Sequence, residues 1–124
     1  SKNMKKSIKV YGAEPEEADD AFQSLKHGKI IPNKTINTIC DGLRAEIGSK
    51  TFPVIKDLVD GIVTVGEEDI KESLRMIWER MKIIVEPSCS ISLAMVIKNR
   101  NIFKSKNVGL IISGGNIDLD SLPW

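Results

Sequence analysis

A serine and two glycines come directly after an apolar run near the end of the sequence. The run is Val108 to Ile112, and Ser113, Gly114, Gly115 and Asn116 follow it. Ligands of open α/β sheets bind outside the carboxyl ends of strands, and glycine lets a backbone approach them closely. A serine hydroxyl there can bind a ring nitrogen or a phosphate oxygen. An ordinary strand-ending turn has the same composition, so both interpretations stay open.

Two groups of acidic residues could also do chemistry. Glu86 precedes Pro87, which suits the first turn of a helix. A carboxylate there is the usual helix cap, and the alternative is that Glu86 lines a pocket. Glu14, Asp19 and Asp20 follow a predicted strand. Hard cations such as Mg²⁺ or Ca²⁺ bind carboxylate and carbonyl oxygens, whereas a solvated acidic helix start is the simpler interpretation.

The composition excludes several classes of function. With 18 basic and 17 acidic residues, the net charge is only +1, and 5% of residues are aromatic. Non-specific binding to nucleic acid or an anionic membrane needs clustered basic charge, so this nearly neutral composition argues against both functions. Two cysteines, Cys40 and Cys89, and the single His27 do not make a disulfide scaffold or a zinc site, and we expect both cysteines to be small buried residues. No apolar run could span a bilayer and the charged start is not a secretory signal, so we expect a cytoplasmic protein.

Hydrophobic patterning places these residues in an α/β protein. It predicts strands at 8–13, 59–65 and 108–112 and helices at 18–25, 52–58, 67–82 and 87–98. The helix at 67–82 is clearest, because Ile70, Leu74 and Ile77 recur at helical spacing and Thr64 with Glu67 forms a possible capping box. The alternation predicts one domain, residues 1–124, with a mostly parallel sheet. Three strands make a narrow sheet with uncovered edges, which indicates part of a larger unit.

Six short motifs, in order, resemble those of one enzyme family. They are Val10 to Pro15, Ala18 to Asp20, Thr38 to Gly42, Trp78 to Lys82, Glu86 to Ser88 and Ser113 to Leu119. Together they resemble the serine racemase and serine/threonine dehydratase family, whose members are fold-type II enzymes that use pyridoxal phosphate (PLP). The resemblance covers nearly the whole chain. It implies a partial three-layer sandwich, the C-terminal part of the large domain of such an enzyme.

The resemblance also implies a cofactor site. By position, Ser113 would hydrogen-bond the pyridine nitrogen of PLP, and Gly42, Glu86 and Gly114 would lie near the cofactor. A neutral hydroxyl, unlike a carboxylate, does not hold that nitrogen protonated. The cofactor is then a weaker electron sink, which favours loss of the β-hydroxyl of a hydroxy amino acid.

A metal site follows from the same resemblance. Glu14, the carbonyl of Ala18 and Asp20 match the ligands of a divalent cation, Mg or Ca, in the racemase-like branch. Cys40 and the run from Ser88 to Ser90 depart from the family's usual residues. These departures leave open which hydroxy amino acid is the substrate.

The resemblance extends to an effector and to polypeptide beyond this sequence. Arg80, Lys82 and Asn116 match positions that help bind ATP at a homodimer interface. The family's Schiff-base lysine motif and its glycine-rich phosphate loop do not occur in residues 1–124. We therefore expect this chain to hold no catalytic residue, to lack the small domain, and to be inactive without the N-terminal half of the enzyme.

Two other functions stay open at this point. The chain could be a non-catalytic metal-binding or interface module that acts only with a partner. It could also belong to another fold-type II PLP enzyme, such as a cysteine synthase, although the acidic cluster between Glu14 and Asp20 argues against that. Racemisation and elimination are not distinguished, because the second acid/base group of a racemase lies in the other half of the family's chain.

Overall fold

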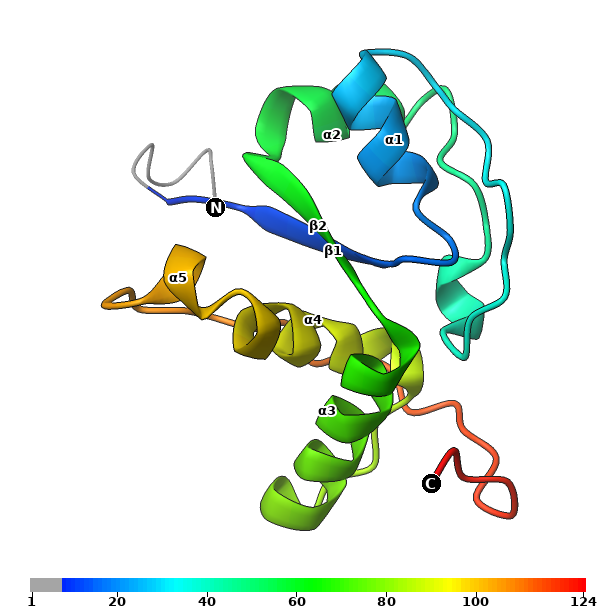
Figure 1. Cartoon of the computed structure of the whole chain (residues 1–124), viewed down its shortest axis with the longest axis vertical. Coiled ribbons are helices and arrows are strands. Elements are labelled where there is room, and N and C mark those ends of the chain that lie inside the picture. The colour runs from blue at the N-terminus through cyan, green and yellow to red at the C-terminus, as the bar shows by residue number, and fades with distance from the viewer. Residues whose placement is uncertain (1–7) are drawn as a thin grey trace.

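The centre of the protein is a two-stranded parallel sheet, seen here in a computed structural model that describes residues 8–124 (Figure 1). Strand β1 (Tyr11–Pro15) pairs with β2 (Gly61–Val65), and the two strands begin and end together. The sequence predicted that the first strand ends at residue 13, and this boundary is wrong. Glu14 and Pro15 both belong to β1. Pro15 has no N–H to donate, and the strand tolerates it because it is the last residue. The charged start of the chain, where we expect no secretory signal, lies outside the described residues.

Both strands begin later than the sequence predicted. Before them, the Asp60 side chain accepts the hydrogen bond of a backbone amide that a neighbouring strand would otherwise accept. The Val10 amide donates to the Asp60 carboxylate over 2.8 Å, and the Asp60 amide donates to the Val10 carbonyl over 2.8 Å. The Lys9 ammonium also contacts the Asp60 carboxylate, over 3.0 Å. A side chain therefore satisfies the backbone where the strands separate.

Helices lie on both sides of the sheet, giving three layers (Figure 1). Helices α1 (Asp20–His27) and α2 (Phe52–Leu58) belong to the crossover between the strands, and α1 contacts β2. Helix α4 (Pro87–Lys98) contacts both strands from the other side. Gly28 ends α1 in the left-handed conformation, with a φ of 71°. The α/β architecture is thus confirmed.

Helix α3 (Glu67–Met81) packs along α4 and has the predicted apolar face. Ile70, Leu74 and Ile77 are all buried, and burial of each such side chain contributes about 1.5–3 kcal/mol. Lys82 ends the helix in the left-handed conformation, with a φ of 58°. A further helical turn, α5 (Arg100–Phe103), follows α4 and was not predicted.

The predicted capping box of α3 is wrong. Gly66 is the N-cap and no side chain caps the helix there. The Glu67 carboxylate instead accepts a hydrogen bond from the Ile39 amide over 2.9 Å, a contact between distant segments that no local motif encodes. Glu67 thereby fixes the long loop between α1 and α2 to the start of α3.

The buried side chains form two clusters, one on each side of α4. The first has Cys40, Val65, Ile70, Ile91, Ala94 and Met95 at its centre. The second has Leu74, Ile77, Val85 and Cys89, with Ile112 and Ile117 packed against it. The second cluster matters for the site, because α4 begins at its edge.

The predicted buried strand at 108–112 is not formed within residues 8–124. Ile111 is 83% exposed, although Ile112 packs on the second cluster. An apolar run becomes a buried strand only when a neighbouring strand accepts its backbone groups, and neither β1 nor β2 lies beside it. The residues up to Ser113 therefore form no ladder in the described part of the chain.

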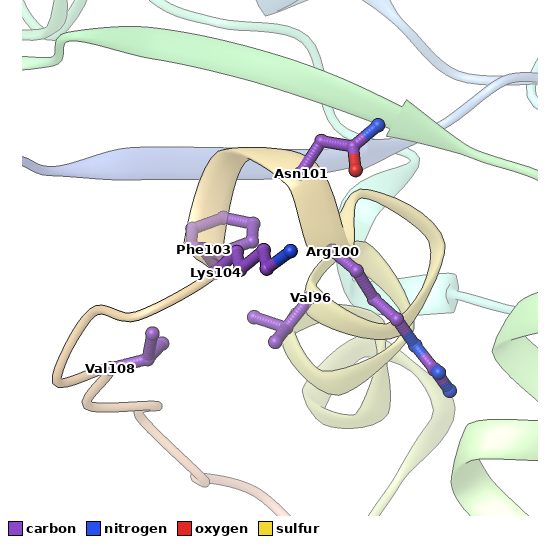
Figure 2. A pocket seen from close by; sticks show the side chains of 6 residues that line it. All are labelled: Val96, Arg100, Asn101, Phe103, Lys104 and Val108. Carbon is purple, nitrogen blue, oxygen red and sulfur yellow. The ribbon is translucent and has the colours of Figure 1, made fainter.

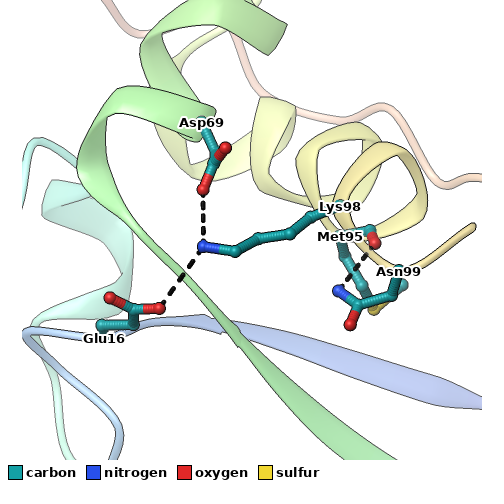
Figure 3. Close-up of polar contacts among 5 residues, drawn as sticks. All are labelled: Glu16, Asp69, Met95, Lys98 and Asn99. Atoms are coloured by element: carbon teal, nitrogen blue, oxygen red, sulfur yellow. Dashed lines mark hydrogen bonds and ion pairs between the residues drawn. The ribbon is translucent and has the colours of Figure 1, made fainter.

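A charged contact joins α4 to the start of α3 and to the end of β1 (Figure 3). The Lys98 ammonium lies 2.7 Å from the Asp69 carboxylate and 3.5 Å from that of Glu16. The side-chain amide of Asn99 donates to the Met95 carbonyl over 3.0 Å at the end of α4. These ion pairs are exposed, so each contributes about 1 kcal/mol or less.

The last residues fold back onto the connection between α3 and α4. The rings of Trp78 and Trp124 meet edge to face with centroids 5.4 Å apart. The Trp78 indole N–H donates to the Val85 carbonyl over 3.0 Å. Among residues 8–124, no helix is long and apolar enough to cross a membrane.

Candidate functional site

The Glu86 carboxylate does not cap its own helix. Glu86 is the N-cap residue of α4, yet its side chain makes no capping hydrogen bond. One carboxylate oxygen accepts from the Asn116 amide over 3.0 Å, and the Glu86 amide donates to the Gly114 carbonyl over 3.3 Å. The helix-cap interpretation is therefore wrong, and the carboxylate faces the segment after the apolar run.

Gly114 cannot be replaced without moving that carboxylate. Its φ is +83°, a conformation that favours glycine. A Cβ at this position would lie 2.6 Å from a carboxylate oxygen of Glu86. The glycine thus provides both a turn and space for the charged group, as the sequence suggested for a site at the end of this segment.

Ser113 lies at the surface beside this turn. Its amide donates to the sulfur of Cys89 over 3.1 Å. Its hydroxyl makes no hydrogen bond to any of residues 8–124, and the residue is exposed. The hydroxyl is therefore free to bind a group from outside.

Gly42 completes the cluster from a distant part of the chain. It lies in a short 3₁₀ turn, η1 (Asp41–Leu43), and its amide donates to the Ser88 hydroxyl over 3.1 Å and to its neighbour Asp41 over 2.8 Å. A Cβ on Gly42 would lie 3.9 Å from a carboxylate oxygen of Glu86. The four residues predicted to bind the cofactor therefore gather at the N-terminus of α4, and we call them the Ser113 cluster: Gly42, Glu86, Ser113 and Gly114.

The three predicted metal ligands lie together at the end of β1, and we call them the acidic cluster: Glu14, Ala18 and Asp20. The two Glu14 oxygens accept from the amides of Ala21 and Phe22 over 3.2 and 2.7 Å, so this side chain caps α1 from a distance. Asp20, 2% exposed, accepts from the Ile47 amide over 2.6 Å and from Asn33 over 3.1 Å.

The electrostatics of the acidic cluster reflect its burial. Burial raises the pKa of the Glu14 carboxyl to about 7; the Phe22 amide opposes this, and the charge of Asp20 adds to it. The carbonyl oxygen of Ala18, a residue 1% exposed, accepts no hydrogen bond within residues 8–124. No group of three or more His, Cys, Asp or Glu side chains in that range could hold a metal ion. The predicted ligand set includes a carbonyl and stays a prediction.

No contact within residues 8–124 brings the three predicted nucleotide-binding residues together. Asn116 lies against Glu86. Arg80 and Lys82 are exposed at the C-terminal end of α3, and neither has an ion-pair partner among residues 8–124. Of the three, only Asn116 therefore contacts the Ser113 cluster.

Both cysteines are buried and unpaired, as the sequence predicted. Burial raises the pKa of the Cys40 thiol to about 12 and also raises the pKa of Cys89. Neither thiol is therefore an activated nucleophile. The contact of Cys89 with Ser113 was missed, because no motif predicts which buried side chain lies under a turn formed 24 residues later.

A pocket of about 390 Å³ lies elsewhere, beside α5 (Figure 2). It is lined by Val96, Arg100, Asn101, Phe103, Lys104 and Val108. Figure 2 shows these side chains, which come from α4, from α5 and from the chain that follows α5. No carboxylate, imidazole, thiol or hydroxyl lines it, so it provides neither the predicted cofactor contacts nor the predicted metal ligands.

Comparison with known proteins identifies the family of the chain. The sequence profile of the family described as pyridoxal-phosphate dependent enzyme matches residues 1–114. The serine racemase of Arabidopsis thaliana is 50% identical over 98% of this chain and 38% of its own length. The beta-hydroxyaspartate dehydratase of Paracoccus denitrificans is 41% identical over 94% of this chain and 37% of its own length.

Solved structures give the same result. The serine racemase of Dictyostelium discoideum superimposes with a TM-score of 0.87 and 47% identity, over 95% of this chain and 38% of that chain. The serine racemase of maize gives a TM-score of 0.90 and 42% identity, over 96% and 38%. This chain thus spans about two fifths of the length of the relatives it matches. On this evidence, the chain belongs to the pyridoxal-phosphate dependent enzyme family.

Proposed function

We propose that the protein that carries this chain is a PLP-dependent serine/threonine dehydratase (an ammonia-lyase) or serine racemase that acts on a hydroxy amino acid. The observation that carries the proposal is the turned Glu86 carboxylate, which contacts Gly114 and Asn116 instead of capping α4. The named relatives, serine racemases and a dehydratase, support the same class. No observation favours a non-catalytic module. The likeness to a cysteine synthase, with 23% identity and a TM-score of 0.57, shows only the fold.

The residues of the Ser113 cluster fit the cofactor. When bound, PLP supplies an electron sink for negative charge at the α-carbon of the substrate. The Ser113 hydroxyl, exposed and without a protein partner within residues 8–124, would hold the pyridine nitrogen. Because this hydroxyl is neutral, it does not keep that nitrogen protonated. Glu86 and Gly114 would orient the serine by fixing the turn beside it.

The acidic cluster fits a divalent cation, and we propose Mg or Ca there. The Glu14 and Asp20 carboxylates and the Ala18 carbonyl provide the hard oxygen ligands that these ions bind. A cation would also offset the repulsion between the buried Asp20 carboxylate and the half-buried Glu14 carboxylate. The ion would join β1 to the start of α1, and its role would then be structural support of the fold around the site.

Four further features of the proposal rest on the family resemblance. We propose that the catalytic lysine and the phosphate loop lie outside residues 1–124, which form the C-terminal part of the large domain. ATP as an effector at Arg80, Lys82 and Asn116, and a homodimer, are proposed on the same ground. The exposed side chains of Met81, Ile83 and Ile84 are compatible with an interface near α3. A cytoplasmic location is supported by two unpaired cysteines.

The proposal is tested on the full-length protein. Ser113→Ala should weaken PLP binding and shift the absorption maximum of the bound cofactor, while Ser121→Ala, at another exposed serine, should change neither. Production of keto acid and ammonia, and of the D-amino acid, from serine, threonine and 3-hydroxyaspartate then identifies the reaction. Equal PLP affinity and equal spectra for Ser113→Ala and wild type would remove Ser113 from the cofactor site.

The metal is tested separately by calorimetric titration with Mg²⁺ or Ca²⁺. Wild type should bind one divalent ion per chain, and Asp20→Asn, which retains one acceptor oxygen for Ile47, should bind it more weakly. Identical heats for the two proteins would contradict the metal assignment and leave the cofactor assignment intact.

A further inference from the structure

Three hydrogen bonds hold the segment from Ser113 to Asn116, and all three lead to the first turn of α4. Glu86 provides two of them, to Gly114 and Asn116. Cys89 provides the third, to the Ser113 amide over 3.1 Å. Because residues 108–112 form no ladder with another strand in the described part of the chain, no sheet shares this task.

Cys89 contacts Ser113 itself, whereas Glu86 contacts residues after it. The residue is 5% exposed and packs with Leu74, Ile77 and Val85. Ile112, the residue before Ser113, rests on the same cluster. Glu86 therefore fixes the chain after Ser113, and Cys89 fixes the amide of Ser113 itself.

We propose that Cys89 is a positioning residue. Its sulfur accepts a hydrogen bond from the Ser113 amide and thereby determines where the Ser113 hydroxyl lies. The amide nitrogen and the hydroxyl belong to one residue, so a fixed amide leaves the hydroxyl only the staggered positions about χ1. The consequence for PLP rests on the function proposed above. The contact with Ser113 does not.

The test uses Cys89→Ala, Cys89→Ser and Ile91→Val in the full-length protein. The first removes the acceptor, the second offers a hydroxyl acceptor, and the third removes one methylene group from the same helix on the opposite cluster. Hydrogen-exchange mass spectrometry of the peptide spanning 110–116, melting temperature and PLP dissociation constant are measured for each.

Cys89→Ala should raise amide exchange in this peptide and the PLP dissociation constant by about two- to tenfold, the range that one ordinary hydrogen bond gives. Cys89→Ser should return the amide exchange and the PLP dissociation constant most of the way to their wild-type values. Its hydroxyl among apolar side chains should lower the melting temperature. Ile91→Val should lower the melting temperature alone. Rescue by serine thus separates positioning from packing.

Two outcomes would overturn the inference. One is unchanged exchange in Cys89→Ala. The other is a set of variants in which exchange and PLP affinity simply follow melting temperature, with Cys89→Ser as impaired as Cys89→Ala. If exchange responds as expected and wild type binds no PLP, the contact stands and the proposed function falls.

Discussion

The Ser113 cluster and the acidic cluster differ in what their polar groups already bind. In the acidic cluster, the Glu14 and Asp20 carboxylates are occupied by backbone amides of α1 and of the following loop. In the Ser113 cluster the hydroxyl is exposed and has no partner among residues 8–124. Substitutions in the acidic cluster should therefore damage the fold first, whereas those in the Ser113 cluster should act mainly on ligand binding.

The largest effect should come from Asp20→Ala. The change leaves the half-buried Ile47 amide and the Asn33 side chain without their acceptor, which costs about 3 kcal/mol of unfolding free energy. Urea denaturation measures it, with Asp19→Ala as the control, since the Asp19 side chain accepts only from Gln23 on the adjoining helix α1. A loss below about 0.5 kcal/mol, the ordinary surface value, would contradict the comparison.

Gly114→Ala should have a smaller effect on stability and a large effect on the cofactor. The positive φ and the approach to Glu86 cost about 2 kcal/mol, and the displaced carboxylate should weaken PLP binding at least tenfold. Gly109→Ala is the matched control, because nothing lies within 4 Å of its added Cβ. Unchanged PLP affinity in Gly114→Ala would show that the turn does not position the site.

Stability should fall as the pH rises from 4.5 to about 7 in the absence of divalent ions. The folded protein keeps the Glu14 proton up to a pKa of about 7, whereas the ordinary pKa of a glutamic acid is 4.5. The unfolded chain therefore binds fewer protons in this window, and stability declines with pH. After a discount for partial exposure, we expect a loss of about 1–1.5 kcal/mol. Glu14→Gln should remove this slope, and an equal slope in that variant would assign it to another group.

The smallest effect should come from Ser88→Ala. The Gly42 amide loses one acceptor but keeps Asp41, 2.8 Å away. The unfolding free energy should change by less than about 0.5 kcal/mol. A change above about 1 kcal/mol would mean that the hydrogen bond between Ser88 and Gly42 itself stabilises the fold, which would weaken the contrast between the two clusters.

Local patterns predicted the elements better than the contacts between them. The spacing of Ile70, Leu74 and Ile77 predicted α3, and Pro87 predicted the start of α4. The capping box at Glu67 was wrong because that carboxylate finds the Ile39 amide in a remote loop. Such partners depend on the tertiary fold, which a motif of four residues does not contain.

The site followed the same division. The motifs named four residues that the structure brings together in the Ser113 cluster, and their role in binding the cofactor stays a prediction. The strand expected before Ser113 was wrong, because hydrophobicity shows what a segment could bury but not which strand is beside it. Cys89 was missed for a similar reason, since its sulfur meets a residue far along the chain.

The edge-to-face contact between Trp78 and Trp124 makes the protein its own optical reporter. The two rings are the only tryptophans in this sequence, and the segment between Ser113 and Trp124 cannot leave α3 without separating them. The ultraviolet emission of the native chain should therefore change when this segment detaches, with no dye attached.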